Sequence, residues 1–326
     1  MGRMGMAVVR GLQGPDDSPV RKLQACAKHF AVHSGPEPER HRFDARPTRR
    51  DLYETYLPAF KDLFTKAGVE EVMTAYNSFE GQPCGASDYL IDTVLHGKWG
   101  YKGVIISDAW AVADFFMEGR HEYVEDQATA AAVAVKNGVD VECGHAYQAI
   151  PEAIERGLLD EADLDRNLKR IIVSRIRLGE IDGIDPWSSL PESIVEGPEH
   201  RALALKMARE TMVLLQNKGG ILPLDPGAKV ALVGPNADDA AMQWGNYNPI
   251  PKETVTLLDE QGHGYSVGDV NHDGKISIAD VTALINYLLS GSTDGACEIC
   301  GNVNGDDKVS IADVTELINI LLSSSN

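Results

Sequence analysis

Polar side chains that could do acid–base or nucleophilic chemistry stand at the ends of three apolar runs. Asp108 closes GVIISD, Lys28 and His29 lie near the end of ACAKHF, and Tyr76 and Asn77 follow VMTA. Because the carboxyl ends of parallel strands carry the chemistry of α/β barrels, we expect these side chains to meet at one mouth. Two other interpretations stay open. Asp108 could cap a helix, and Lys28 alone would suit the Schiff-base lysine of an aldolase-type barrel.

An internal repeat indicates a second kind of chemistry, the binding of calcium. Residues 268–289, GDVNHDGKISIADVTALINYLL, recur at 301–322 as GNVNGDDKVSIADVTELINILL, with 16 of 22 positions identical. Each copy has oxygen-bearing residues at the spacing by which a twelve-residue loop surrounds a calcium ion. Polar turns without a metal are the alternative, but the pattern precedes an apolar helix twice. The expected ligands, with the carbonyl oxygens of the two lysines, are Asp269, Asn271, Asp273, Lys275, Ser277 and Asp280 in loop 1 and Asn302, Asn304, Asp306, Lys308, Ser310 and Asp313 in loop 2.

The two loops differ in their carboxylates. Loop 1 offers three side-chain carboxylates, whereas loop 2 offers two because Asn302 stands at its first position. Asp307 also occupies the sharp turn that Gly274 makes in loop 1, where glycine avoids strain. Since calcium affinity follows the number of charged ligands, we expect loop 2 to bind calcium more weakly than loop 1.

Elements that must position Asp108 alternate along the first part of the sequence. Apolar and β-rich runs predict strands, and apolar residues at helical spacing predict helices between them. This alternation is typical of parallel βαβ units whose strands are buried on both faces. A complete eightfold barrel needs about 250 residues, so we expect a partial (β/α)8, TIM-type barrel of α/β class. The expected strands are 25–30, 72–76, 103–107 and 138–142, and the expected helices are 48–64 (capped by Thr48), 87–97, 126–137, 161–178 and 199–216.

Composition shifts divide the chain into four parts. Residues 1–185 form the partial barrel, 186–258 a linker and the start of an α/β sandwich domain, 259–267 a linker, and 268–326 a small all-α calcium-binding module. The apolar run KVALVG at 229–234 is the expected first strand of the sandwich domain. The N-terminal stretch lacks an apolar core long enough for a signal peptide and predicts a helix already under way. One side of that helix should carry Met4, Val8, Val9 and Leu12.

Charge and cysteine usage exclude several classes of function. A formal charge of -19 without a basic cluster argues against a nucleic-acid partner. No apolar run approaches the roughly 18 residues of a membrane span, so no membrane partner is expected. Cys26, Cys84 and Cys143 stand singly in apolar stretches and are expected to be buried thiols. The lone pair in CEIC, Cys297 and Cys300, cannot supply four zinc ligands and leaves a short-loop disulfide or two idle thiols open.

The repeat closely resembles a type I dockerin, because each calcium loop has an exit helix but no entry helix. The resemblance implies two structural calcium ions, a cohesin domain of a cellulosome-like scaffold as partner, and an extracellular location, although no signal peptide is present. A calcium buffer or sensor would need the missing entry helices. A stripe that recurs in both copies, Val281, Leu284, Ile285 and Leu288, should pack the two helices together. The implied partner contacts are Ile278, Ala279, Asn286 and their copies Ile311, Ala312, Asn319.

Six ordered blocks resemble glycoside hydrolase family 3, nearest to bacterial β-xylosidases and β-glucosidases. They include KHFAVHSGPEPERHRFDA, VMTAYNSFEGQPCGAS and WGYKGVIISDAWA. The resemblance implies a retaining mechanism, without a cofactor, on oligosaccharides derived from plant polysaccharides. It assigns Asp108 as the nucleophile, Lys28 and His29 to the sugar hydroxyls, and Met73 and Tyr76 to the lining of the sugar subsite.

The sequence departs from this family pattern in two ways. Ala109 and Trp110 follow the nucleophile, where many relatives have Trp or Cys-Gly. Relatives also extend further at both ends, and their acid/base glutamate lies beyond the matched region, so that Glu142 and Glu80 are the nearest carboxylates to the mouth. We therefore carry two hypotheses: a β-glycosidase attached to a scaffold, or a truncated, impaired chain that acts only as a calcium-dependent cohesin-binding module.

Overall fold

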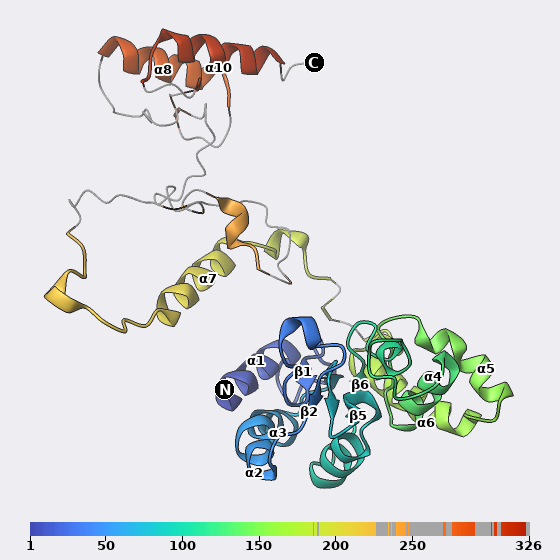
Figure 1. The fold of residues 1–326 in the computed structure, drawn as a ribbon. Coiled ribbons are helices and arrows are strands. Elements are labelled where there is room, and N and C mark those ends of the chain that lie inside the picture. The colour runs from blue at the N-terminus through green and yellow to red at the C-terminus, as the bar shows by residue number, and fades with distance from the viewer. Residues whose placement is uncertain are drawn as a thin grey trace. The chain divides into compact units, whose positions relative to one another are not determined.

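The computed structural model describes residues 1–184, 186–187, 189–225, 234, 236, 239–245, 247, 270–271, 276–290, 301, 303–304 and 308–323 (Figure 1). The chain divides into two compact units, Met1–Leu190 and Pro191–Asn326. Among the described residues, no helix is long and apolar enough to cross a membrane.

A parallel sheet organises the first unit. Val104 and Ile105 are adjacent on one strand and both are buried, and because successive side chains point to opposite faces, the sheet is covered on both faces. Val141 adds a parallel bridge to Ile106, and the predicted fourth strand therefore extends the sheet by a single bridge. In the order β1-β3-β6, the strands are β1 (Cys26–Phe30), β3 (Glu71–Thr74) and β6 (Val104–Ile106).

Helices follow the strands as the βαβ pattern predicts. The expected helix 48–64 is present as α2, a π-helical turn and α3, and the side chain of Thr48 accepts the backbone N–H of Asp51. Asp126 and Asp160 cap α4 and α6 in the same way. The longer elements of this unit are α1 (Gly2–Gln13), α2 (Arg49–Asp51), η2 (Leu52–Tyr56), α3 (Leu57–Lys66), η4 (Tyr89–Lys98), α4 (Gln127–Lys136), α5 (Ile150–Glu155) and α6 (Glu161–Arg177).

Short elements beyond the strand ends build the loops. A small sheet pairs β2 with β4 in parallel and β4 with β5 antiparallel, which joins the loops after β1 and β3. These strands are β2 (Asp44–Ala45), β4 (Ser78–Phe79) and β5 (Gln82–Pro83), and the 3-10 turns of the chain are η1 (Glu37–Glu39), η3 (Cys84–Ala86), η5 (Ala113–Phe115), η6 (Ala146–Ala149), η7 (Glu192–Ile194), η8 (Lys218–Gly220) and η9 (Ala240–Gln243).

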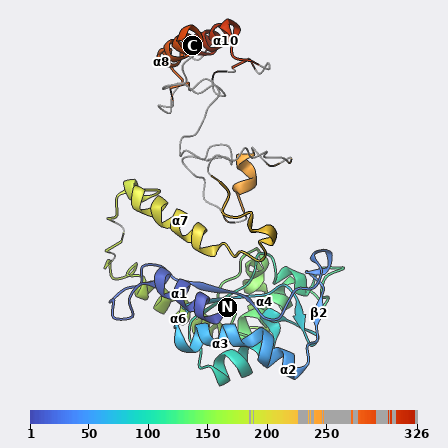
Figure 2. The ribbon, with the colours of Figure 1, turned by 90° about the vertical axis from the view of Figure 1, so that its left-hand side faces the viewer.

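The buried face of α1 is not the predicted one. Val9 is buried as expected, but Met4, Val8 and Leu12 are exposed. The helix packs against α3, next to which it lies in Figures 1 and 2, through a face that includes Gly5. A Cβ at Gly5 would come within 2.9 Å of the Leu63 side chain, so the absence of side-chain bulk lets the two helices approach closely.

Cysteine burial follows the prediction only in part. Cys84 is buried and Cys26 is half-buried, but Cys143 is exposed. Cys143 lies just beyond the single bridge at Val141, where the sheet ends, so its apolar sequence neighbours do not enclose it.

In the second unit, α7 (Pro198–Thr211) corresponds to the predicted helix at 199–216. Two further helices, α8 (Ile278–Ser290) and α10 (Ile311–Ser323), follow the two calcium loops. Their stripe packs as predicted at Val281, Leu284 and their copies, whereas Ile285 is 37% exposed. The predicted strand at 229–234 lies outside the described residues apart from Gly234, as do Cys297 and Cys300.

Candidate active site

Asp108 is presented at the carboxyl end of β6. Its side chain is 14% exposed, and Oδ1 accepts the backbone N–H of Ala109 at 2.8 Å. The next helical turn, η5, begins only at Ala113, with Val112 as its N-cap, so Asp108 does not cap a helix. The helix-cap interpretation of Asp108 is therefore wrong, and its second oxygen, Oδ2, faces other side chains.

His29 lies beside Asp108, at the end of the next strand but one. Its Nε2 atom is 3.2 Å from Asp108 Oδ2. Burial lowers the pKa of His29, the charge of Asp108 opposes that shift, and the charge of Lys28 adds to it. The imidazole is therefore neutral near pH 7 and faces the carboxylate through N–H polarity rather than through a full charge. The structure brings His29 and Asp108 together as predicted, and Lys28 is close enough for its charge to act on the imidazole of His29.

Tyr76 approaches Asp108 from the end of β3. Its hydroxyl donates a hydrogen bond to the Asp108 carboxylate, and burial, followed by the Asp108 charge, raises the pKa of Tyr76 to about 12. The phenol thus stays protonated as a donor at physiological pH. Met73 is half-buried on β3, opposite Ile106 in the register, and no described feature tests its role in a sugar subsite.

Asn77 does not belong to this group, contrary to prediction. Its side chain is fully buried, and its amide donates to the carbonyls of Ala31 and Ser78 at 3.3 and 3.0 Å. The amide satisfies loop backbone that would otherwise be buried without partners, which is a structural role.

The sequence analysis missed a hydrogen-bonded group behind Tyr76. The carboxylate of Asp114 is 3% exposed and lies 2.7 Å from His41 Nδ1, and the His41 ring packs on Tyr76 with centroids 4.4 Å apart. His121 holds the same segment, since its Nε2 atom lies 2.6 Å from the Tyr76 carbonyl. These residues come from three loops whose approach no sequence spacing encodes. His41 lies within a block that resembles a known family, whereas Asp114 and His121 lie outside those blocks and had no such signal.

The contacts of Glu80 and Glu142, the two carboxylates expected nearest to the mouth, do not identify either one as the general acid/base. Glu80 is exposed and pairs with Arg49 at 3.1 Å. Glu142 follows the bridge residue Val141, and its buried Oε1 has no hydrogen-bond partner in the part of the chain that the structure describes. The general acid of a glycosidase is therefore not assigned to a residue here.

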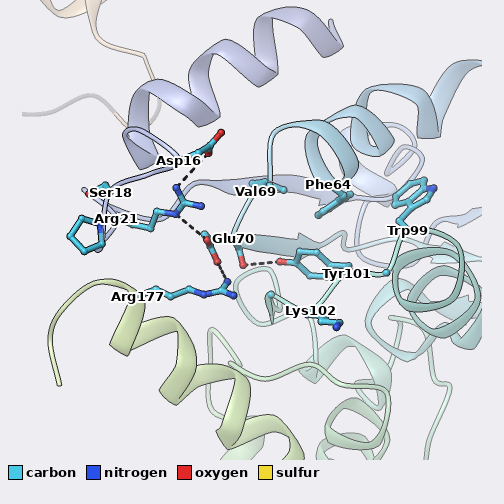
Figure 3. Close-up of a pocket in the computed structure, with 14 residues that line it drawn as sticks. Asp16, Ser18, Arg21, Phe64, Val69, Glu70, Trp99, Tyr101, Lys102 and Arg177 are labelled. Atoms are coloured by element: carbon cyan, nitrogen blue, oxygen red, sulfur yellow. Dashed lines mark hydrogen bonds and ion pairs between the residues drawn. The ribbon is translucent and has the colours of Figure 1, made fainter. Parts of the chain in front are cut away.

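A cavity of about 440 Å³ lies at the opposite edge of the sheet (Figure 3). There Glu70, just before β3, accepts from Arg21 at 3.2 Å and Arg177 at 2.5 Å, while Tyr101 donates to its backbone carbonyl. Because the amino ends of barrel strands serve stability and the carboxyl ends serve chemistry, this ion-pair cluster has a structural role.

In the described parts of the calcium loops, the last expected ligand of each loop is a buried carboxylate, which is the kind of oxygen ligand that calcium binds. Asp280 is fully buried and accepts the backbone N–H groups of Asn271 at 3.0 Å and Ser277 at 2.7 Å. Asp313 repeats this with Asn304 and Ser310. Burial opposes the shift, but these N–H donors lower the pKa of Asp313, so it is ionised as a calcium ligand must be. Asp269, Asp273, Lys275, Asn302 and Asp306 lie outside the described residues.

Comparisons with known proteins match both parts of the chain. The sequence matches the glycosyl hydrolase family 3 N terminal domain over residues 1–174 and the dockerin type I domain over residues 267–322. It is 47% identical over 264 residues to a xylan 1,4-beta-xylosidase of Xylanibacter ruminicola, covering 78% of this chain and 30% of that protein. It is 35% identical to beta-D-xylosidase 1 of Arabidopsis thaliana, covering 73% of this chain and 32% of that protein.

Solved structures show the same likeness. A GH3 exo-beta-xylosidase (XlnD) in complex with a xylobiose aziridine activity based probe has a TM-score of 0.73 at 26% identity, covering 86% of this chain and 38% of that one. A beta-glucosidase from Listeria innocua in complex with glucose has a TM-score of 0.67 at 33% identity, covering 75% and 34%. The chain spans about a third of the length of the curated relatives named above. Its first unit has the TIM-type α/β fold of these proteins, and the chain belongs to glycosyl hydrolase family 3, with a dockerin type I domain at residues 267–322.

Proposed function

We propose that the chain is a retaining β-glycosidase, of β-xylosidase or β-glucosidase type, acting on oligosaccharides derived from plant polysaccharides. The observation that carries the proposal is the Asp108 carboxylate at the carboxyl edge of the sheet, flanked by His29 at 3.2 Å and by the Tyr76 hydroxyl. These two contacts orient the carboxylate, as the attack of a nucleophile requires. The xylosidase and glucosidase relatives support the same class of reaction.

In this mechanism Asp108 attacks the anomeric carbon while the glycosidic bond breaks, and a covalent glycosyl-enzyme forms that water then hydrolyses. Lys28 and His29 bind the sugar hydroxyls, and Met73 and Tyr76 line the subsite. A second carboxyl group about 5 to 5.5 Å away protonates the leaving group in retaining enzymes. That group is the part of the machinery with no assigned residue in this chain.

A mechanism-based label tests the nucleophile without needing the general acid. The reagent is a 2-deoxy-2-fluoro-β-xyloside or -glucoside with a dinitrophenolate leaving group. This leaving group departs without protonation, and the fluoroglycosyl group remains bound to the enzyme as the covalent intermediate. We expect the intact mass to rise by one fluoroglycosyl group, on the peptide that contains Asp108. Asp108→Asn should abolish labelling, whereas Asp126→Asn, a helix cap on the surface, should leave it intact. Labelling at another residue, or none, would refute the proposal.

For residues 268–326 we propose attachment to a cohesin domain of a cellulosome-like scaffold, outside the cell, with one calcium ion in each loop. The dockerin match and the two buried carboxylates, Asp280 and Asp313, support this role. Ile278 is 70% exposed and its copy Ile311 is 72% exposed, so both are accessible to a partner. Binding of a type I cohesin that is lost in EGTA and restored by calcium would test it.

A second candidate function is that of a calcium-dependent cohesin-binding module with an impaired catalytic unit. The absence of an assigned acid/base among the described carboxylates near Asp108 favours it. Hydrolysis of aryl β-xyloside and β-glucoside by the chain would distinguish the two. Turnover that Asp108→Asn abolishes supports the glycosidase, and intact cohesin binding without turnover supports the module alone.

A further inference from the structure

Two side chains from one loop pack against the ring of Tyr76. The guanidinium of Arg40 lies 5.0 Å from the ring centroid and the imidazole of His41 lies 4.4 Å from it, and Arg40 Nε donates to His41 Nε2 at 3.2 Å. Both come from the loop after β1, whereas Tyr76 itself follows β3. Because these two side chains are also bonded to each other, they form one packed surface that limits rotation of the ring about χ1 and so helps to set the direction of its hydroxyl.

The imidazole of His41 is in turn fixed by a buried carboxylate. Asp114, in the loop after β6, lies 2.7 Å from His41 Nδ1 and is 3% exposed. Arg120 is 3.7 Å from the other Asp114 oxygen. The backbone N–H of His121 bonds to the Asp114 carbonyl at 3.0 Å, and the His121 ring reaches the Tyr76 carbonyl. Three loops are thus tied together around one phenol, with Asp114 at their centre.

We propose that Asp114 and His41 are positioning residues that hold the Tyr76 ring so that its hydroxyl donates to the Asp108 carboxylate. The inference rests on the proposed role of Asp108 as nucleophile. The burial of Asp114 supports it, because a carboxylate is costly to bury unless it is paired and hydrogen-bonded. Its partner His41 contacts the Tyr76 ring with centroids 4.4 Å apart, and so acts through that ring.

The titration of the Tyr76 phenol reports this arrangement without any turnover. Four groups face the ring, namely Asp108, Arg40, His41 and Asp114, and the Asp108 carboxylate is the one that accepts a hydrogen bond from its hydroxyl. A ring released from the Asp108 carboxylate and exposed to water should ionise closer to the ordinary pKa of about 10. His41→Phe keeps an aromatic ring and the Asp114 charge but removes the hydrogen bond between them.

The experiment follows the ¹³Cζ resonance of Tyr76, assigned with Tyr76→Phe, between pH 8 and 11.5. We expect the parent resonance to move little, and His41→Phe and Asp114→Asn to lower the Tyr76 pKa by about one unit. Asp140→Asn is the matched control, since it also removes a buried carboxylate, paired with Arg170, and should leave the Tyr76 pKa unchanged. Unchanged titration in both test variants would overturn the inference.

A double-mutant cycle separates positioning from the simple loss of a negative charge. If Asp114 acts through the Tyr76–Asp108 hydrogen bond, Asp114→Asn should add little to the shift caused by Asp108→Asn, whereas an independent charge effect would add in full and overturn the inference. Labelling of Asp108 should be about tenfold slower in Asp114→Asn than in the parent. An unlabelled parent would refute the proposed nucleophile, while the titration still decides the role of Asp114 and His41.

Discussion

Burial of two histidines makes stability depend on pH at the scale of single residues. Burial lowers the pKa of His121, although its contact with the Tyr76 carbonyl opposes the shift, and burial likewise lowers the pKa of His29. Near pH 6 the unfolded chain therefore binds more protons than the folded chain, so folding stability falls as pH falls through and below 6.5. Burial raises the pKa of Asp114 and Asp140, and this contributes with the opposite sign, because a carboxyl that holds its proton more tightly in the folded chain favours folding as pH falls.

We expect the free energy of unfolding to decrease between pH 7.5 and 5.5. His121→Gln keeps a donor for the Tyr76 carbonyl but cannot be protonated, so it should make this decrease shallower. Urea unfolding of the parent and the variant at three pH values across this window provides the test. Parallel pH dependences for the two proteins would show that His121 does not contribute.

Single residues were predictable where a strand end fixes them and unpredictable where loops bring them together. Asp108, His29 and Tyr76 follow strands whose order places them at one edge, and the structure brings them together. Asn77 has the same sequence position relative to its strand, yet the need to satisfy buried loop carbonyls turns its side chain inward. Asp114 and His41 meet through loops after different strands, so no local spacing could reveal their contact.

Two glycines should respond in opposite directions to alanine at the scale of secondary-structure elements. Gly11 lies inside α1, and a Cβ there would meet nothing within 4 Å. Gly11→Ala should therefore stabilise the chain by about 0.5 to 1 kcal/mol through lower backbone entropy of the unfolded state.

Gly103 lies just before β6, and a Cβ there would overlap the Glu70 carbonyl oxygen. That carbonyl accepts the N–H of Val104 at 3.1 Å, so it cannot move without breaking the strand pairing. We expect Gly103→Ala to cost about 1 to 3 kcal/mol. Thermal or urea unfolding of both variants measures the pair, and a stabilising effect at Gly103 would contradict the close approach of β3 and β6.

The helix that follows β1 depends on its cap. Thr48 accepts the N–H of Asp51 at 3.1 Å, which satisfies one of the free donors at the helix start. Thr48→Ala should cost about 1 kcal/mol of folding stability. Thr65→Ala is the matched control, because Thr65 is exposed and bonds only to the Lys61 carbonyl inside the helix, where the loss should be near zero. Equal losses in the two variants would contradict a role for the cap.

Sequence periodicity predicted the existence of these elements better than their faces. The expected helix over 48–64 and strand over 103–107 are present because cap and apolar run are local signals. The face of α1 was predicted wrongly, since periodicity weighs Met4, Val8 and Leu12, whereas helix approach is governed by the absence of side chains at Gly5. Packing between elements is a property of the folded chain that hydrophobic spacing alone does not contain.

At the scale of the whole molecule, each unit has its own buried cluster and its own chemistry. The first unit surrounds the sheet that presents Asp108, and the second contains the paired helices α8 and α10, joined through Leu284 and Leu317. Calcium should therefore stabilise the second unit alone. Removing calcium with EGTA should lower the thermal transition of the dockerin helices and leave the labelling of Asp108 unchanged, as paired calorimetry and mass measurements would check.

The two calcium loops should differ in affinity because their carboxylates differ. The buried Asp280 and Asp313 are equivalent, each accepting two backbone N–H groups, so the difference must come from the remaining ligands. Loop 1 has one carboxylate more than loop 2, because its first position is Asp269 whereas the first position of loop 2 is Asn302. Titration calorimetry of the calcium-free chain should resolve a tighter and a weaker site. Asn302→Asp should strengthen the weaker site about tenfold, since affinity follows ligand charge. Equal sites in the parent, or no response to Asn302→Asp, would show that charge count does not set the order.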